Sequence, residues 1–168
     1  MFRRMKKNRE PKRGFTLIEM IIAVALLAVA GTVAVRLFVQ ARVNNSLSHD
    51  IDRAVFYGSS WIERIKSFPE DWTDGNMSAL DTAVLKTGTC SYVVYYDENW
   101  NPVSGGESSN RDAEYALHID LFSTDYAGLW TIELRAFKIH PYPLQNEAYR
   151  EIYSLSAMVN VPGKAVAQ

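Results

Sequence analysis

The chain has 168 residues, 48% of them hydrophobic and 22% charged, which excludes a disordered or collagen-like protein and corresponds to about one domain. The formal net charge is −1, but residues 1–14 hold seven of the 18 Lys and Arg residues and one of the 19 acids. This head therefore carries +6, and residues 15–168 carry −7. The separation of charge excludes a uniformly basic nucleic-acid-binding protein and a cytosolic enzyme with evenly mixed surface charge. The single cysteine, Cys90, excludes an intramolecular disulfide and a cysteine-based metal cluster.

Residues 15–35 form an almost uninterrupted apolar segment of 21 residues directly after the basic head. As a helix rising about 1.5 Å per residue, this segment spans about 30 Å, the thickness of a bilayer core. A secretory signal peptide is one alternative, but its apolar region usually has about 7–15 residues and ends in a small-residue cleavage site. A buried core helix is the other, and it would need a larger domain around it. The Lys and Arg residues before the segment predict a single-pass helix with a cytoplasmic N-terminus.

Glu19 is an acidic residue near the start of this apolar segment. A carboxylate in a membrane segment is costly and is a functional candidate by default. The helical neighbours at i−4 and i+4 are Phe15 and Ala23, so neither supplies a positive charge. A cut between Gly14 and Phe15 would create an α-amino group one helical turn from Glu19, or opposite the Glu19 of a neighbouring chain.

Residues 12–20, with the sequence KRGFTLIEM, resemble the type IV prepilin signature of type IV pilins and of the pseudopilins of type II secretion. The resemblance implies that a prepilin peptidase cuts after Gly14 and methylates the new N-terminal Phe15. It also implies that Glu19 is the acid of the motif, which pairs with an N-terminal amine during assembly. Lys12 and Arg13 then belong to a basic leader, residues 1–14, that orients the precursor and is removed.

The helix is predicted to continue beyond the membrane segment, because no proline occurs between Pro11 and Pro69. Apolar residues recur every three or four positions from Val43 to Ile65, and Pro69 predicts an end near Lys66. The second half is therefore amphipathic. Residues 54–65 are similar to a stretch of minor pilins and minor pseudopilins. The membrane half also lacks the proline of many major pilins.

Four later segments predict β-strands that alternate apolar and polar residues or are rich in β-branched and aromatic residues: 89–96, 114–122, 129–139 and 151–161. Alternation indicates an antiparallel sheet with one buried face, which the amphipathic half-helix 43–66 must cover. Residues 70–88 are predicted to be a loop with at most a short turn of helix. The expected fold class is α+β, and the resemblance implies a pilin-like arrangement: a long N-terminal helix packed on a C-terminal antiparallel sheet of about four strands.

No pattern of catalytic or nucleotide-binding residues stands out, so neither a catalytic residue nor a cofactor nor a metal is predicted. The histidines are far apart in sequence, and His118 is expected to be solvated on the polar face of a strand. The acidic stretch 71–81 contains oxygen ligands suited to Ca²⁺, but a solvated acidic loop is the favoured interpretation. Tryptophans are expected in the core or as loop anchors, and Cys90 as a small buried hydrophobe. These residues are His49, His118 and His140; Asp71, Asp74, Asn76 and Asp81; and Trp61, Trp72, Trp100 and Trp130.

Two hypotheses of different classes follow. In the first, the protein is a structural subunit, a minor pilin or pseudopilin of a type IV pilus or a type II secretion pseudopilus. Residues 15–35 then form the transmembrane and filament-core helix, and residues 36–168 an extracytoplasmic globular domain in the periplasm or outside. The expected partners are prepilin peptidase, other pilin or pseudopilin subunits, an inner-membrane assembly platform and, before assembly, membrane lipid; nucleic acid is not expected.

In the second hypothesis, the protein is an unprocessed single-pass anchor that presents a small extracytoplasmic binding domain. The residues Gly14 to Glu19 favour the first, because an anchor does not need them.

Overall fold

A long helix dominates the first part of the described chain. The computed structural model describes residues 16–73, 77, 81, 83–104 and 113–161. Helix α1 spans Leu17–Ser67, 51 residues without a proline, and the short helix α2 spans Pro69–Thr73. Phe68 separates the two helices, since the residue before a proline disfavours helical geometry. The predicted end of the long helix near Lys66 is confirmed to within one residue.

The chain divides into two compact units, Met1–Ala41 and Arg42–Gln168. In the first unit, the described residues belong to α1 apart from Thr16, and their side chains are exposed with the exception of a partly buried Val39. In the second unit, α1 places a buried stripe against a sheet. In the first unit, the apolar side chains of α1 are therefore largely exposed, whereas in the second unit a stripe of them is buried against the sheet.

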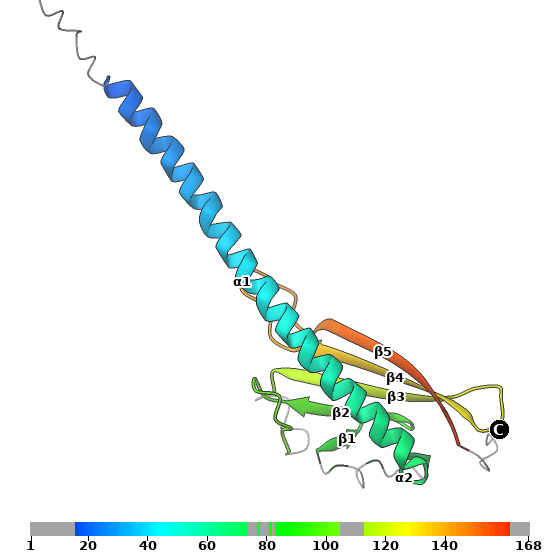
Figure 1. Ribbon diagram of the computed structural model, residues 1–168. Helices are drawn as coiled ribbons and strands as arrows, with labels where there is room; N and C mark the ends of the chain where they lie inside the picture. Colours follow the sequence, from blue (N-terminus) through cyan, green and yellow to red (C-terminus); the bar gives the residue numbers. More distant parts are fainter. Residues whose placement is uncertain (1–15, 74–76, 78–80, 82, 105–112, 162–168) are drawn as a thin grey trace, which may run out of the picture. The chain divides into compact units, whose positions relative to one another are not determined.

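The second unit contains a five-stranded antiparallel sheet with the strand order β1-β2-β3-β4-β5 (Figure 1). Each strand pairs with its sequence neighbour, so the sheet is a meander. The strands are β1 Val84–Lys86, β2 Ser91–Tyr96, β3 Tyr115–Ser123, β4 Leu129–Lys138 and β5 Arg150–Asn160. The four predicted strands correspond to β2 to β5. Strand β1 was missed inside the predicted loop 70–88, because three residues are too few to show an alternation.

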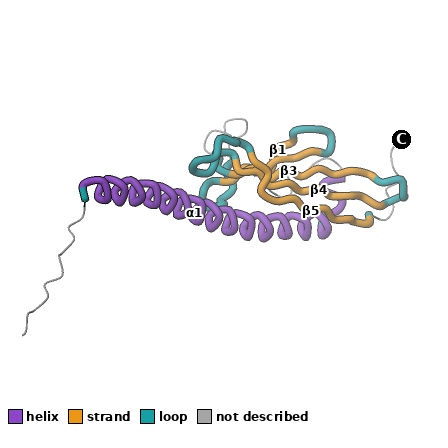
Figure 2. The backbone as a smooth tube through the Cα atoms, turned by 90° about the horizontal axis from the view of Figure 1, so that it is seen from above, coloured by secondary structure: helices purple, strands orange, loops and turns teal. Residues whose placement is uncertain are grey.

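The second half of α1 covers one face of this sheet, so helix and sheet form two layers, seen from above in Figure 2. The helix side of the core is made by small and large residues at helical spacing, among them Ala54, Trp61 and Ile65. A Cβ added at Gly58 would lie 3.1 Å from Leu134 Cδ2, so the absence of a side chain allows this close packing. The predicted α+β class, with a long helix packed on an antiparallel sheet, is confirmed.

Buried aromatic side chains join the layers by hydrogen bonds as well as by packing. Trp61 Nε1 donates to Tyr96 Oη at 2.8 Å, and Trp72 Nε1 donates to the backbone oxygen of Ile65 at 2.8 Å. Trp100 stacks on Tyr115 with ring centroids 4.3 Å apart. Trp61, Trp72 and Trp100 are buried, and the partly buried Trp130 packs against the same core. The prediction that the tryptophans anchor the core is confirmed.

Candidate processing and assembly site

The first turn of α1 is organised by Thr16 and Glu19. Glu19 Oε2 accepts hydrogen bonds from the Thr16 backbone N at 2.7 Å and from Thr16 Oγ1 at 2.9 Å, and the Glu19 backbone N–H donates to Thr16 Oγ1 at 3.3 Å. Met20 N–H donates to the Thr16 carbonyl oxygen at 3.2 Å. This reciprocal arrangement is a capping box with Thr16 as the N-cap. It directs the Glu19 carboxylate back toward the N-terminal end of the helix.

Beyond this turn, α1 presents an apolar surface. Thirteen large hydrophobic side chains are more than half exposed: Leu17, Ile18, Met20, Ile21, Ile22, Val24, Leu26, Leu27, Val29, Val33, Val35, Leu37 and Phe38. The one hydroxyl deep in this stretch, Thr32 Oγ1, is satisfied locally by donating to the Ala28 carbonyl oxygen at 2.9 Å. By length and composition, with a mean hydropathy of 2.5 in its most apolar stretch, α1 is able to cross a membrane. A surface of this kind needs lipid or other apolar helices around it.

Some of the predicted site residues precede Thr16, the first residue that the structure describes, and one follows it. Lys12, Arg13, Gly14 and Phe15 lie outside the described residues. Glu19 lies in the first turn of α1 with its carboxylate on Thr16. Thr16 is a local partner of Glu19 that was not predicted, because only cations were considered as partners of a carboxylate. The signal was present, since Thr-x-x-Glu before an apolar stretch is the capping-box pattern.

The N-terminal segment also matches a known family model. Residues 11–35 match the prokaryotic N-terminal methylation motif. No curated protein and no solved structure is found to match this chain. The fold and this segment define a protein with an N-terminal methylation motif, an apolar helix and an α+β domain. Together they support a type IV pilin-like protein, a family that is structural and not catalytic.

The motif carries further implications for this chain. It suggests a type IV pilin-type precursor and implies processing by prepilin peptidase and assembly with other pilins. Together with the apolar helix α1, it fits membrane anchoring and pilus assembly.

A second carboxylate of α1, Asp50, lies in a buried polar network that was not predicted from the sequence. Asp50 is 4% exposed, and its oxygens accept hydrogen bonds from Tyr115 Oη at 2.9 Å and from Tyr142 Oη at 2.6 Å. Lys138 Nζ lies 3.5 Å from Asp50 Oδ2 and 2.8 Å from Glu114 Oε1. The network therefore ties α1 to β3, to β4 and to the loop between β4 and β5.

Burial and hydrogen bonding shift the titration of these groups. Burial raises the pKa of Tyr115 to about 12, with the Asp50 carboxylate acting in the same direction. Burial and the bond to Asp50 likewise raise the pKa of Tyr142. Burial acts to lower the pKa of Lys138, but its bonds to Glu114 and Tyr115 outweigh this effect, and the pKa is raised. The arrangement holds neutral tyrosines and a charged lysine around the buried Asp50, which is a stabilising role.

The histidine predictions are corrected at one position. His118 is partly buried, not solvated, because Tyr149 in the loop after β4 lies over it, with His118 Nε2 2.6 Å from Tyr149 Oη. Phe137 contacts the same imidazole edge-on, at a centroid distance of 5.1 Å. Burial lowers the pKa of His118. His49 and His140 are exposed.

The acidic stretch 71–81 is described only in part. Asp81 accepts a hydrogen bond from Arg64 Nη1 at 3.3 Å and one from the Ala83 backbone N at 3.0 Å. Asp74 and Asn76 lie outside the described residues. Within the described ranges, no group of three or more His, Cys, Asp and Glu side chains is placed to hold a metal ion. Cys90 is partly buried and packs against the core, less buried than predicted.

Proposed function

We propose that the protein is a minor pilin or pseudopilin, made as a single-pass membrane precursor and assembled into a filament through its N-terminal helix. Prepilin peptidase cuts between Gly14 and Phe15, the new N-terminal Phe15 is methylated, and residues 1–14 are removed. The observation that carries the proposal is the stretch from Gly14 to Glu19, placed between a basic head and an apolar helix inside the matched segment 11–35.

The exposed apolar surface of α1 supports assembly by helix packing. Large hydrophobic side chains occur all around the helix between Leu17 and Phe38, so no single face can be buried to satisfy them. Membrane lipid satisfies this surface before assembly, and the helices of neighbouring subunits satisfy it afterwards. Assembly with other subunits at an inner-membrane platform then exchanges lipid contacts for helix contacts.

The first turn of α1 supports a role for Glu19 in pairing with an N-terminal amine. The capping box already holds the carboxylate against the Thr16 backbone N, and Phe15 is the residue attached to that nitrogen. After the cut, the Phe15 ammonium of this subunit or of a neighbour meets a carboxylate in an apolar setting, where an unpaired charge is costly.

The orientation and the minor-subunit assignment rest on two further features. Lys12 and Arg13 belong to the positive head, which favours a cytoplasmic N-terminus and a periplasmic or extracellular domain 36–168. The absence of proline throughout α1, with Arg36 in its first half, separates this chain from many major pilins and favours a minor pilin or a minor pseudopilin.

Processing is tested by coexpressing the chain with a prepilin peptidase and measuring the intact mass. The expected product lacks residues 1–14 and carries one methyl group on the Phe15 amine. Replacement of the last leader residue, Gly14→Leu, serves as the matched control and is expected to remain uncut. An uncut wild-type chain, in cells that cut a known prepilin, would contradict the proposal and favour the unprocessed membrane anchor.

A further inference from the structure

The two edges of the sheet differ in length and in chemistry. At one edge, β1 has three residues and ends in Lys86. At the other edge, β5 has eleven residues, and from Ile152 to Asn160 it contains neither a charged residue nor a proline. In the part of the chain that the structure describes, no strand pairs with the outer side of β5. Long edge strands are normally protected by charge, proline or brevity, so this edge is open to another strand.

The backbone groups that β5 offers at this edge follow from the ladder. Val161 N–H donates to the Gly128 carbonyl oxygen at 2.7 Å, and Leu129 is paired with Asn160. Because hydrogen-bonded and non-hydrogen-bonded pairs alternate in an antiparallel ladder, Ser154, Ser156 and Met158 direct their N–H and C=O groups away from β4. The side chains of these three residues are exposed. The edge therefore presents regularly spaced donors and acceptors.

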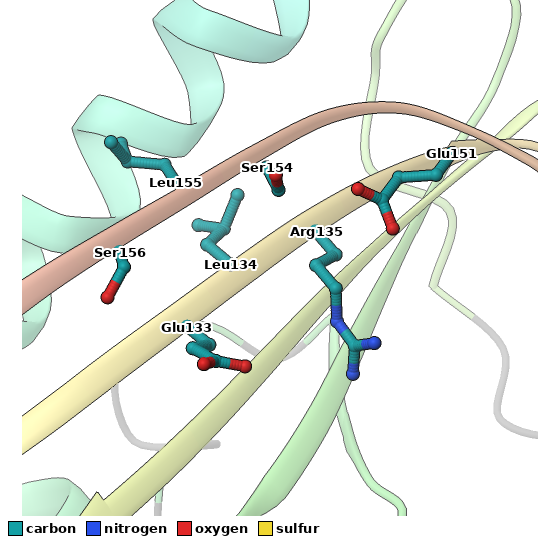
Figure 3. Close-up of a pocket in the computed structure, with 7 residues that line it drawn as sticks. All are labelled: Glu133, Leu134, Arg135, Glu151, Ser154, Leu155 and Ser156. Carbon is teal, nitrogen blue, oxygen red and sulfur yellow. The ribbon is translucent and has the colours of Figure 1, made fainter.

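The outer face beside this edge is acidic. A hollow of about 220 Å³ lies along β4 and β5, and its lining includes Glu133, Glu151, Ser154 and Ser156 (Figure 3). Arg135 lies in the same hollow, but its Nη2 already donates to Asp120 Oδ2 at 2.9 Å. Asp120, Glu133 and Glu151 all act on this one guanidinium, so negative charge exceeds positive charge here.

On the opposite side of the edge, β5 offers the apolar side chains Leu155 and Ala157, and α1 offers both apolar and charged side chains. A second hollow between α1 and β5 is lined by Ile62, Leu155 and Ala157, with Ser59, Glu63 and Lys66 at its helix side. Glu63 and Lys66 form an ion pair, with Lys66 Nζ 3.5 Å from Glu63 Oε1. A strand added to β5 would direct alternate side chains to the hollow beside α1 and to the acidic one.

We propose that the free edge of β5 pairs with an extended segment of a partner protein in which apolar residues facing α1 alternate with Lys or Arg residues facing Glu133 and Glu151. Backbone hydrogen bonds supply the pairing, and the two hollows supply the selection of side chains. A second copy of this chain is a poor match, because Ile152 to Asn160 brings no cation. Residues 42–168 also carry 17 acidic residues against 10 Lys and Arg. The proposal uses none of the processing residues and stands apart from the function proposed above.

The test measures binding of short peptides to the full chain in nonionic detergent micelles. The probe is an octapeptide of alternating Lys and Val, and the matched probes are the Glu–Val octapeptide and a Lys–Val peptide of equal composition without alternation. The alternating Lys–Val peptide is expected to bind about tenfold or more tightly than either, because only it matches both hollows. Equal binding of the three peptides would overturn the proposal.

Variants separate strand pairing from simple charge attraction. Ser156→Pro removes an outward N–H without removing a ladder bond to β4, and should weaken binding about tenfold or more, whereas Ser156→Thr retains binding. Glu133→Gln combined with Glu151→Gln should reduce the preference for Lys over Glu. Two further peptides carry N-methyl groups at alternate residues, one at the odd positions and the other at the even positions. Only the peptide whose methylated nitrogens face β5 should lose binding, and this result does not depend on the folding of any variant. Binding unchanged by Ser156→Pro and by both N-methylated registers would overturn the proposal.

The same variants and peptides distinguish two other occupants of the β5 edge from the proposed partner. Concentration-dependent dimerisation that Ser156→Pro abolishes would assign the edge to a second copy and overturn the proposal. Peptide binding that appears only after removal of residues 162–168 would assign the edge to the chain's own C-terminal segment, with the same consequence. A monomeric chain that binds the Lys–Val peptide with or without residues 162–168 supports the proposal.

Discussion

Each half of α1 contains a carboxylate with hydrogen-bonded partners, and the surroundings of the two carboxylates are opposite. Glu19 is fully exposed and bonded to Thr16 within its own helical turn. Asp50 is buried and is held by Tyr115 and Tyr142, which lie 65 and 92 residues further along the chain. The second unit therefore satisfies its buried charge by folding. In the described part of the first unit, the apolar side chains of α1 stay exposed.

The two halves of α1 should therefore respond differently to substitution. In the second unit, apolar and polar groups of α1 are matched by the sheet, so substitutions there should change the stability of the fold. In the first unit, the described side chains have few partners within the chain, so substitutions should change membrane and assembly behaviour while the fold remains stable. Each of the following predictions tests this contrast.

The largest expected effect is at Asp50. Asp50→Ala removes the buried acceptor of two tyrosine hydroxyls and one of the two carboxylates beside Lys138, and should lower the free energy of unfolding of the second unit by about 3–5 kcal/mol. Asp52→Ala, at an exposed position of the same helix, is the control and should change it by less than about 0.5 kcal/mol. Denaturant unfolding of the full chain in micelles measures the free energy of unfolding of both variants. Equal stability of the two variants would show that the network does not hold the helix.

Alkaline pH should weaken the same network and the buried hydrogen bond between Trp61 and Tyr96. The pKa values of Tyr96 and Tyr115 are raised to about 12 from an ordinary value of 10, and those of Tyr142 and Lys138 are also raised. The folded state therefore keeps protons that the unfolded chain releases, so this stability is present below about pH 10 and is lost as the pH rises toward 12. Thermal melting of the full chain across this range provides the measurement. A melting temperature that stays constant over this range would contradict the assigned burial.

The glycines of α1 allow a smaller test of the same contrast. Gly58→Leu must displace Leu134, which a Cβ at this position already approaches to 3.1 Å, and overpacking of this kind costs about 1–3 kcal/mol. Gly31→Leu is the matched variant, because nothing lies within 4 Å of a Cβ added there. Its effect on unfolding of the second unit should be close to zero. If both variants destabilised the second unit equally, the packing of α1 on the sheet would have to be revised.

The regular elements were predictable from periodicity, and the contacts between distant residues were not. The end of α1 followed from Pro69, and β2 to β5 followed from alternation, because both signals are local. Strand β1 has only three residues and gave no such signal. The network around Asp50 gave no signal either, since nothing local indicates that Lys138 and two distant tyrosines surround this residue.

At the candidate site, too, a contact between side chains was not predicted, although Thr16 and Glu19 are close together in the sequence. The stretch from Gly14 to Glu19 was predictable because the motif is contiguous. Thr16 was not predicted as a partner of Glu19, because a carboxylate in an apolar segment was expected to need a cation. His118 was expected to be solvated from its place on the polar face of a strand. Tyr149, in the loop after β4, lies over His118, and an irregular loop has no periodicity from which its path could be predicted.

The smallest effect on the fold, and the most specific effect on function, is expected for Glu19→Gln. Glutamine accepts the same hydrogen bonds in a capping box, so the first turn of α1 and the stability of the second unit should be unchanged. Processing should persist, since the cut lies on the N-terminal side of Thr16. The charge is lost, and with it the pairing to an N-terminal ammonium, so recovery in purified filaments relative to membranes should fall. Glu19→Asp should restore it in part, limited by the shorter side chain.

Glu19→Ala is the matched variant, because it removes both the cap and the charge. If the charge is what assembly requires, Glu19→Gln and Glu19→Ala should be recovered in filaments at similarly low ratios. If the capping box is what assembly requires, Glu19→Gln should assemble normally and Glu19→Ala should not. Thr16→Val separates the two further, because it removes the cap hydroxyl and keeps the carboxylate. Normal assembly of Glu19→Gln beside defective Thr16→Val would transfer the role of Glu19 from amine pairing to helix initiation, while the argument for cleavage after Gly14 would be unaffected.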